Sequence, residues 1–423
     1  MLKDLSNTSH TVRRALMLMP RVLLMPALLI LGSVPRGVQA QQQSSPERQQ
    51  QQRPRRVGGQ APAAADRPAP SSTPSVGEEV DEDDVVRVDT QLVSVPAIVT
   101  DSAGRILTGL RADNFSVFED GSAQRIANFA TTEAPFEVAL LLDTSGSTRA
   151  DVGLIRRAAN AFIESLRPGD RVAVIAFSSV PDGASKLATI EIKTKLTDNR
   201  AALREAVESI GSSNGTPFYD GLERVARDVF RESPRDEARG RQALVALTDG
   251  VDSTSETEFA DARDQLRRAG LVCYFIQVNT EEFVENRLLQ DCADNGTLTL
   301  SRQQLQRYRR IFASSADAAD YSSFCRLGQF ERMDISRALY KLARQEMDTL
   351  ARDSGGRTYT VAELREARAA FARIAAEIGT QYSLGYYPTN KARDGRFRTI
   401  RVEVRGVKNA QVRAREGYQA PRS

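Results

Sequence analysis

The chain has 423 residues, a mass of 46.5 kDa and a formal net charge of +3, with 41% apolar and 27% charged residues. These values are ordinary for a soluble globular protein and leave room for two or three domains. His10 is the single histidine, and tryptophan is absent. If the N-terminus is removed on export, the mature protein has no imidazole, which excludes Ser–His–Asp and Cys–His catalytic sites and His-ligated zinc or iron.

The first 40 residues resemble a signal peptide. Basic residues open the chain, a short apolar run covers residues 22–34, and residues 38–40 form a small-x-small cleavage pattern. The run is shorter than the about 20 residues that a membrane span needs; an uncleaved anchor is the alternative, and only then do we expect membrane contact. Cleavage removes five basic residues and one acidic residue, so the mature charge is −1. The sequence therefore predicts a secreted, periplasmic or cell-envelope protein that does not bind nucleic acid.

The segments after the signal differ in composition. Residues 41–84 are rich in Gln, Pro and Ala and end in an acidic run, which predicts a disordered linker. Residues 85–133 are predicted to form β-strands, with one strand over 115–119 and a turn at Asp120-Gly121. Pro96 predicts an edge strand or a bulge there.

The C-terminal residues 380–423 have the same β character. Apolar and polar residues alternate over 400–405, as in a half-buried strand, and 382–387 and 411–415 are its expected neighbours. We expect the N- and C-terminal flanks to form one small β domain with the middle of the chain inserted between them.

Residues 134–379 alternate between strands and helices. Largely apolar runs predict strands over 136–142, 171–177, 243–248 and 271–278. Helical spacing predicts helices over 152–166, 199–210, 218–230, 258–268, 333–351 and 362–378. Asp198 is the expected N-cap of the second helix. The pattern predicts an α/β fold with a doubly wound, mostly parallel sheet flanked by helices.

Oxygen-bearing side chains follow the predicted strands. The first strand runs into Asp-x-Ser-x-Ser, which places Asp143, Ser145 and Ser147 at its end; Thr216 precedes a helix, and Asp249 follows a later strand. All three segments are expected at the carboxyl edge of the sheet, where open α/β sheets bind ligands. Hard oxygen ligands favour Mg²⁺ or Mn²⁺, with Ca²⁺ the less favoured ion, over zinc or copper.

This set resembles the metal-ion-dependent adhesion site of the von Willebrand factor type A (VWA) domain, and the resemblance covers about residues 135–378. The flanking β segments also resemble a bacterial, secreted VWFA-related family. The resemblance implies that Asp143, Ser145, Ser147, Thr216 and Asp249 hold the metal and that an unidentified protein partner supplies a carboxylate to complete its shell. It also implies adhesion or protein interaction without enzymatic turnover, and a last helix, residues 362–378, that shifts when ligand binds.

Residues 281–330 depart from a minimal domain of this type and are interpreted as an insertion. The sequence leaves open whether it lies near the metal edge or at the opposite pole. Two of the three cysteines, Cys292 and Cys325, bracket it, and they are candidates for a disulfide in an exported protein. The third, Cys273, is expected in the core.

Two other functions fit parts of the sequence. A structural or assembly protein of the envelope would use the metal only to stiffen the loops. A metal-dependent hydrolase would need a base such as Asp249 or Asp252 to activate a metal-bound water, but Asp252 is better interpreted as a loop or helix-capping residue. The sequence therefore favours a metal-dependent interaction module over both alternatives.

Overall fold

A computed structural model of the chain describes residues 92–131, 135–146, 152–179, 188–231, 241–289, 300–314 and 324–422. All of these belong to the compact unit Glu82–Ser423. The predicted signal peptide and linker lie outside the described residues. None of the described helices has the length and apolar character needed to cross a membrane.

A mostly parallel sheet forms the centre of the fold, as predicted, and it has six strands. Its strand order is β10-β9-β8-β5-β6-β7, and every pair is parallel except β6 with β7. The strands are β5 (Glu137–Leu142), β6 (Arg171–Ser179), β7 (Ala188–Thr197), β8 (Gln242–Thr248), β9 (Val272–Val278) and β10 (Arg357–Val361). The chain leaves β5 to form β6 on one side and later returns to form β8 on the other, so β5 marks a topological switch point.

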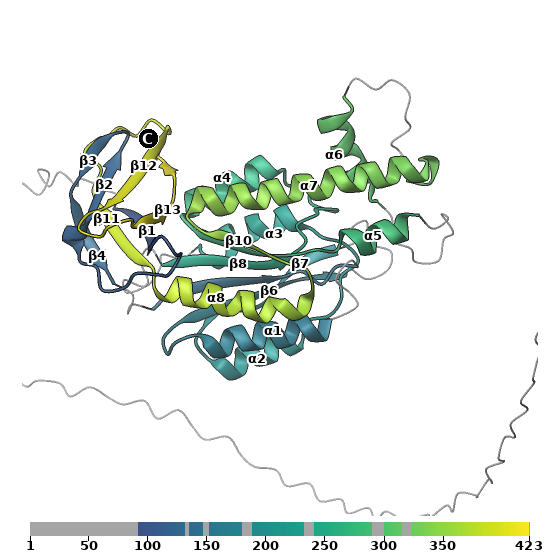
Figure 1. The fold of residues 1–423 in the computed structure, drawn as a ribbon. Helices are drawn as coiled ribbons and strands as arrows, with labels where there is room; N and C mark the ends of the chain where they lie inside the picture. The colour runs from purple at the N-terminus through teal and green to yellow at the C-terminus, as the bar shows by residue number, and fades with distance from the viewer. Residues whose placement is uncertain are drawn as a thin grey trace, which may run out of the picture. The chain divides into compact units, whose positions relative to one another are not determined.

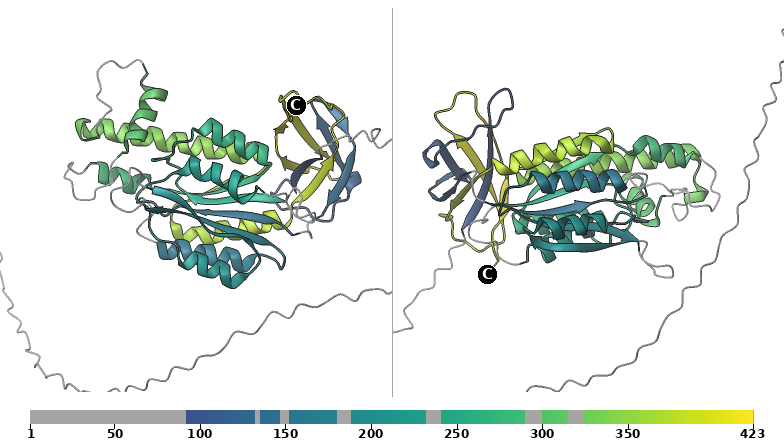
Figure 2. Two further views of the ribbon diagram at one scale, coloured as in Figure 1. Left: turned by 180° about the vertical axis from the view of Figure 1, so that it is seen from behind. Right: turned by 90° about the horizontal axis from the view of Figure 1, so that it is seen from below.

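Helices cover both faces of this sheet (Figures 1 and 2). One face packs against α1 (Val152–Ser165), α2 (Arg200–Glu208) and α8 (Ala367–Gly379), which follows the short helix η7 (Leu364–Glu366). The other face packs against α3 (Phe218–Arg224) with the π-helix η4 (Val225–Val229), α4 (Phe259–Ala269) and the end of α7 (Gln329–Ser354). Because both faces are covered, the inner strands are apolar along most of their length, as the sequence indicated.

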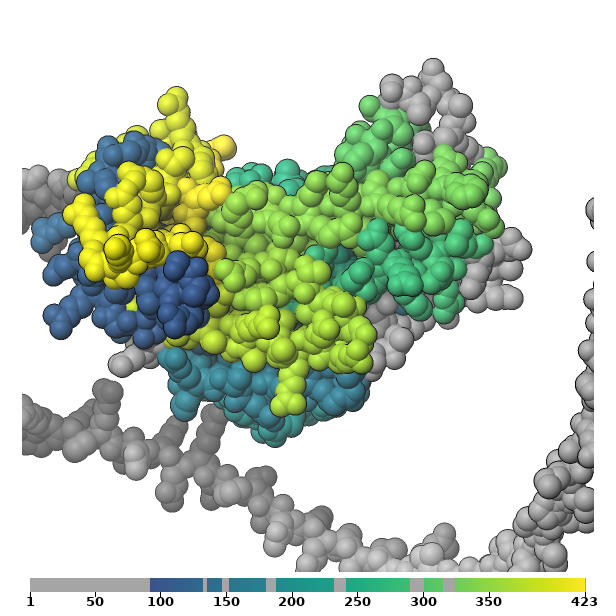
Figure 3. All heavy atoms as spheres, in the orientation of Figure 1, coloured from purple at the N-terminus to yellow at the C-terminus, as the bar shows by residue number. Residues whose placement is uncertain are grey.

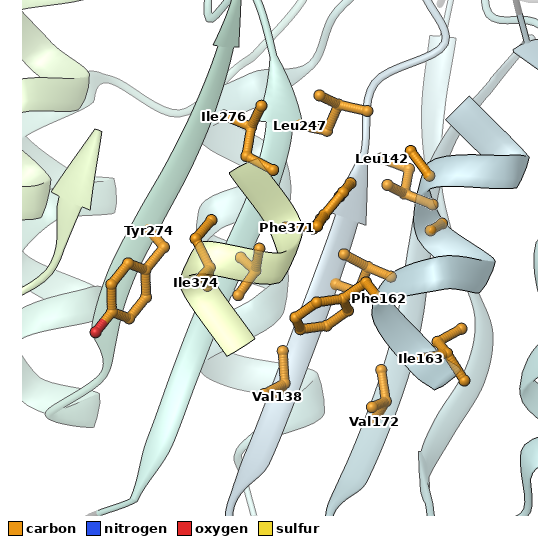
Figure 4. Close-up of a cluster of buried hydrophobic side chains, with 14 of the residues drawn as sticks. Val138, Leu142, Phe162, Ile163, Val172, Leu247, Tyr274, Ile276, Phe371 and Ile374 are labelled. Carbon is orange, nitrogen blue, oxygen red and sulfur yellow. The ribbon is translucent and has the colours of Figure 1, made fainter. Parts of the chain in front are cut away.

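The core beneath α1 and α8 shows how the two layers meet (Figure 4). Phe162 of α1 and Phe371 of α8 lie over the sheet with their ring centroids 5.2 Å apart. Val138 and Leu142 of β5 project toward them on alternate positions and are fully buried. Burial of each such side chain contributes roughly 1.5–3 kcal/mol of transfer free energy, which fixes β5 and therefore the residue that follows it, Asp143.

The two flanks form one β domain, as predicted. Its two four-stranded sheets have the orders β13-β1-β11-β4 and β14-β12-β2-β3, so each sheet takes strands from both ends of the chain. The strands are β1 (Val93–Thr100), β2 (Phe115–Glu119), β3 (Ser122–Gln124), β4 (Ile126–Ala130), β11 (Tyr382–Tyr386), β12 (Phe397–Val404), β13 (Gln411–Ala414) and β14 (Gly417–Gln419), with the short helix η2 (Ala112–Asn114) before β2. Figure 3 shows the two ends, blue and yellow, sharing one surface.

Pro96 lies in β1, which has neighbours on both sides, so the expectation of an edge strand is wrong. β1 pairs with β11 over Val93 to Ala97, but its pairing with β13 begins only at Ala97. Pro96 therefore has a strand neighbour on one side only. The absence of an amide hydrogen at Pro96 is tolerated because β13 does not pair with this residue.

The helix α2 is capped by Asn199 and not by Asp198, which corrects the sequence prediction. The Asn199 side chain accepts hydrogen bonds from the backbone N–H groups of Ala201 at 3.0 Å and Ala202 at 3.2 Å. We expect Asn199→Ala to lower the free energy of unfolding by about 1 kcal/mol, because these N–H groups lose their acceptor. Urea denaturation would measure this, with Asp198→Ala as the matched control. Equal effects of the two substitutions would contradict the assignment.

Candidate metal site

The topology brings two predicted ligands to one point. Asp143 directly follows β5 and Asp249 directly follows β8; these strands are parallel neighbours, with Leu142 opposite Leu247. Both carboxyl groups therefore lie at the same edge, beside the switch point where open α/β sheets bind ligands. Thr216 lies in the loop between α2 and α3, two residues before α3 begins.

Hydrogen bonds fasten the three loops together. The N–H of Ser213 donates to the carbonyl of Thr144 at 2.8 Å, which joins the Thr216 loop to the Asp143 loop. Thr216 and Ser253 exchange two bonds, from the Thr216 N–H to Ser253 Oγ at 2.8 Å and from the Ser253 N–H to the Thr216 carbonyl at 3.0 Å. These contacts bring Thr216 to the loop that carries Asp249.

Asp143 itself is held by two donors. The Ser145 N–H donates to Asp143 Oδ1 at 2.9 Å, and the Thr248 hydroxyl donates to Asp143 Oδ2 at 2.6 Å. Sequence reasoning did not select Thr248. The signal was present, however, because Thr248 ends an apolar strand next to Asp249 and belongs to the same carboxyl edge.

The described site residues are all buried: Asp143, Ser145, Thr216 and Asp249 have relative exposures of 0%, 2%, 5% and 2%. Ser147 lies outside the described residues, so its role stays a prediction. Burial first, and the nearby charge of Asp249 second, raise the pKa of Asp143 to about 7 despite the lowering effect of its hydrogen bonds. Holding both carboxylates ionised at this edge is therefore unfavourable without a compensating positive charge.

The chemistry of the donors fits a hard divalent cation. Two buried carboxylates, a serine and a threonine supply oxygen only, which suits Mg²⁺ or Mn²⁺. A cation at the edge would offset the repulsion that raises the pKa of Asp143. Among the described residues, no three His, Cys, Asp or Glu side chains form a group that could hold a metal, so a site here depends on hydroxyl ligands as well as carboxylates.

Asp252 acts as a helix cap, in agreement with the sequence interpretation. Its Oδ2 accepts hydrogen bonds from the N–H groups of Phe218 at 2.9 Å and Tyr219 at 3.2 Å, at the start of α3. It also accepts from the hydroxyl of Ser255. Burial raises the pKa of Asp252 to about 6. With these donors Asp252 holds α3, and through it the Thr216 loop, in place.

The described residues of the predicted insertion, 281–330, lie beside the edge of the sheet that carries Asp143 and Asp249. Its described helices are α5 (Glu281–Leu288), α6 (Arg302–Phe312) and η6 (Phe324–Arg326). They pack around α7 in a separate apolar cluster that also contacts Val251, two residues after Asp249. The Ser301 hydroxyl donates to the carbonyl of Ser253 at 2.6 Å. The insertion therefore borders the loops that carry the predicted ligands.

The predictions for the three cysteines have different outcomes. Cys273 is buried and free, as expected, and burial raises its pKa to about 12. Cys325 takes part in a disulfide bond. Cys292 lies outside the described residues, so the pairing of Cys292 with Cys325 stays a prediction.

The family model of the von Willebrand factor type A domain matches residues 137–308, from the start of β5 into α6. Residues 137–308 are a VWA domain. The matched residues include Asp143, Thr216 and Asp249. No curated protein sequence matches the chain. The VWFA-related resemblance of the flanks stays a prediction.

Solved structures that resemble the chain include three bacterial proteins. A von Willebrand factor type A protein from Catenulispora acidiphila is 13% identical, with 80% of this chain and 75% of that chain covered and a TM-score of 0.37. The pilus adhesin SpaC from Lactobacillus rhamnosus GG, in its open conformation, is 11% identical over 76% and 49%, with a TM-score of 0.37. The vWF domain of the type V pili tip protein Mfa5 from Porphyromonas gingivalis is 14% identical over 59% and 96%, with a TM-score of 0.32.

Proposed function

We propose that the chain is an exported, non-enzymatic interaction module that binds a carboxylate of a partner protein through Mg²⁺ or Mn²⁺. Asp143, Ser145, Ser147, Thr216 and Asp249 would hold the metal. The observation that carries the proposal is the convergence of Asp143 and Asp249 from neighbouring strands onto one buried edge, with the Thr216 loop fastened beside them. The VWA domain over residues 137–308 supports it.

The chemistry of the proposed site suits recognition of an acid. Hydroxyl ligands are neutral, so a divalent ion held by two carboxylates and hydroxyls keeps an attraction for a further anionic oxygen. A carboxylate from Asp or Glu of the partner supplies that oxygen. The metal, when bound, provides a Lewis-acidic contact point, and the side chains of this chain position it and shield it from bulk water.

The proposal predicts metal binding that depends on Asp143. We expect titration calorimetry to show Mn²⁺ and Mg²⁺ binding to the wild-type chain and none to Asp143→Ala, because the substitution removes a buried ligand. Asp170→Asn is the matched control: Asp170 is also buried but caps backbone N–H groups of Phe136 and Arg167 at the opposite edge of the sheet. It should lower stability and keep metal affinity. A wild-type chain that binds neither ion would contradict the proposal.

A partner test separates this function from a structural role of the metal. Once a partner is in hand, its binding should be abolished by EDTA and restored by Mn²⁺, and it should be lost on substitution of a partner Asp or Glu. Binding that persists in EDTA, with the fold intact, would favour the envelope-scaffold alternative, in which the metal only stiffens the loops.

A further inference from the structure

Two hydroxyl groups outside the predicted ligand set contact Asp249. The Thr280 hydroxyl donates to Asp249 Oδ2 at 2.7 Å, and the Tyr340 hydroxyl lies 2.7 Å from Thr280 Oγ1 and 3.5 Å from Asp249 Oδ2. Thr280 follows β9 and precedes α5, and Tyr340 comes from α7. All three residues are buried, with exposures of 6%, 4% and 2% for Thr280, Tyr340 and Asp249. The contacts are therefore shielded from competing water.

The direction of this small network follows from counting protons. An ionised carboxylate only accepts hydrogen bonds, and a threonine hydroxyl has one proton. Thr280 gives that proton to Asp249, so Tyr340 must donate to Thr280 Oγ1. The Tyr340 to Asp249 distance of 3.5 Å is too long for a strong bond. The result is a chain of donors that runs from Tyr340 through Thr280 to Asp249.

This arrangement orients the carboxylate without occupying it. The Val251 N–H donates to Asp249 Oδ1 at 3.1 Å while Thr280 donates to Oδ2, so both oxygens are fixed in direction. A carboxylate oxygen has two lone pairs, so it can accept a hydrogen bond and bind a cation together. Partners that orient metal ligands in this way typically change metal affinity 10- to 100-fold when removed.

The same helix, α7, also contacts α6 and α3 through Glu346. Glu346, six residues after Tyr340, pairs with Arg307 of α6 at 2.7 Å and accepts a hydrogen bond from the Tyr219 hydroxyl at 2.7 Å. Arg307 also lies over the Tyr219 ring, 4.6 Å from its centroid. Tyr219 follows Thr216 by three residues. Through Tyr340, α7 therefore lies next to Thr280 and Asp249, and through Glu346 it contacts α3, the helix that follows the Thr216 loop.

We infer that Thr280 and Tyr340 are positioning residues of the metal site and that they couple its occupancy to α7 and the adjoining insertion. The inference rests on the proposed metal function. Asp249 already accepts a hydrogen bond from Thr280, which in turn accepts one from Tyr340. Binding or release of a cation at Asp249 is therefore linked to Tyr340 through two hydrogen bonds. Stabilising α7 in this position would in turn favour metal binding, because the coupling of two linked equilibria is reciprocal.

Substitution of Thr280 tests the inference in the full chain. We expect Thr280→Val, which keeps the shape and removes the hydroxyl, to weaken Mn²⁺ binding about tenfold or more in calorimetry. Thr280→Ser, which keeps the hydroxyl, should restore near-wild-type affinity. Tyr340→Phe removes the first donor of the chain and should weaken binding to a smaller extent. Thr358→Val is the matched control, because Thr358 Oγ1 is buried without a hydrogen bond among the described residues.

Hydrogen exchange distinguishes a positioning role from a merely structural one, because a merely structural role would not make amide exchange near Tyr340 depend on Mn²⁺. We expect saturating Mn²⁺ to slow amide exchange around Tyr340 in the wild type and in Thr358→Val, but not in Thr280→Val. A Thr280→Val chain that is less stable yet binds Mn²⁺ as tightly as the wild type would overturn the inference and leave the proposed function standing. If Thr280→Val does not fold, unchanged Mn²⁺ affinity in Tyr340→Phe would overturn it. A wild type that binds no Mn²⁺ would overturn both.

Discussion

Gly356→Ala is expected to destabilise the chain by about 4 kcal/mol or more. Gly356 precedes β10 and lies against β9, where an added Cβ atom would be 1.9 Å from the carbonyl oxygen of Cys273 and 2.7 Å from its carbon. Cys273 cannot yield, because β9 is paired with β8 on its other side, with Leu244 opposite Cys273. Relief therefore requires that β10 separate from β9, which also shifts α7, the helix that ends directly before it.

The matched control for this prediction is Gly211→Ala. A Cβ atom at Gly211 meets nothing within 4 Å, so we expect a change of less than about 0.5 kcal/mol in the free energy of unfolding. Urea denaturation followed by circular dichroism, together with thermal melts, would measure both. Since typical domains have only 5–15 kcal/mol of stability, Gly356→Ala should melt at a much lower temperature. Equal stability of the two variants would show that β10 does not lie as closely on β9 as described.

The sheet was predictable because its strands are buried on both faces. Residues 138–142 and 243–247 are continuous apolar runs, and the structure places them in the adjacent strands β5 and β8. The carboxyl-edge rule then indicated where Asp143 and Asp249 would meet. The alternation of strands and helices indicates the crossover connections, and these set which strands are neighbours. The fold and the position of Asp143 and Asp249 at the ends of adjacent strands therefore followed from the sequence.

The edge strands were not predicted, for a physical reason. β7 carries the lysines Lys193 and Lys195 among its apolar residues, and β10 is only Arg357–Val361. At the margin of a sheet a strand has one neighbour and needs less apolar surface, so its pattern is weak. The cap of α2 was misplaced by one residue because Asp198 and Asn199 are equally good candidates by type, and only the backbone geometry distinguishes them.

The residues around Asp249 show where sequence reasoning ends. Thr280 follows the end of β9, so the rule that found Asp143 would also have flagged this threonine had it been applied to every strand. Tyr340 gave no such signal. It lies in the middle of a 26-residue helix, and its approach to the metal edge depends on how α7 packs against the insertion. Side chains that support a ligand come from tertiary packing, which residue spacing does not encode.

Metal affinity is expected to fall about 30-fold between pH 8.0 and pH 5.5, because a proton competes with the cation for Asp143. The pKa of this carboxyl is raised to about 7, by burial first and by the charge of Asp249 second. At pH 8.0 Asp143 is mostly ionised and ready to bind, whereas at pH 5.5 only about 3% is ionised. An unburied Asp, with its ordinary pKa of 3.8, would show almost no change over this range.

The raised pKa of Asp143 also makes the stability of the metal-free protein depend on pH, in the opposite direction to metal affinity. Asp143 holds its proton in the folded state up to about pH 7 but loses it near pH 3.8 when unfolded, so stability without metal should fall as the pH rises from about 4 to 7. Mg²⁺ should therefore raise the melting temperature more at pH 8.0 than at pH 5.5. Asp143→Asn cannot titrate at this position. This variant should therefore lose part of the pH dependence of its stability and also the rise in melting temperature caused by Mg²⁺. Calorimetry that gives equal Mg²⁺ affinities at the two pH values would show that Asp143 does not bind the ion.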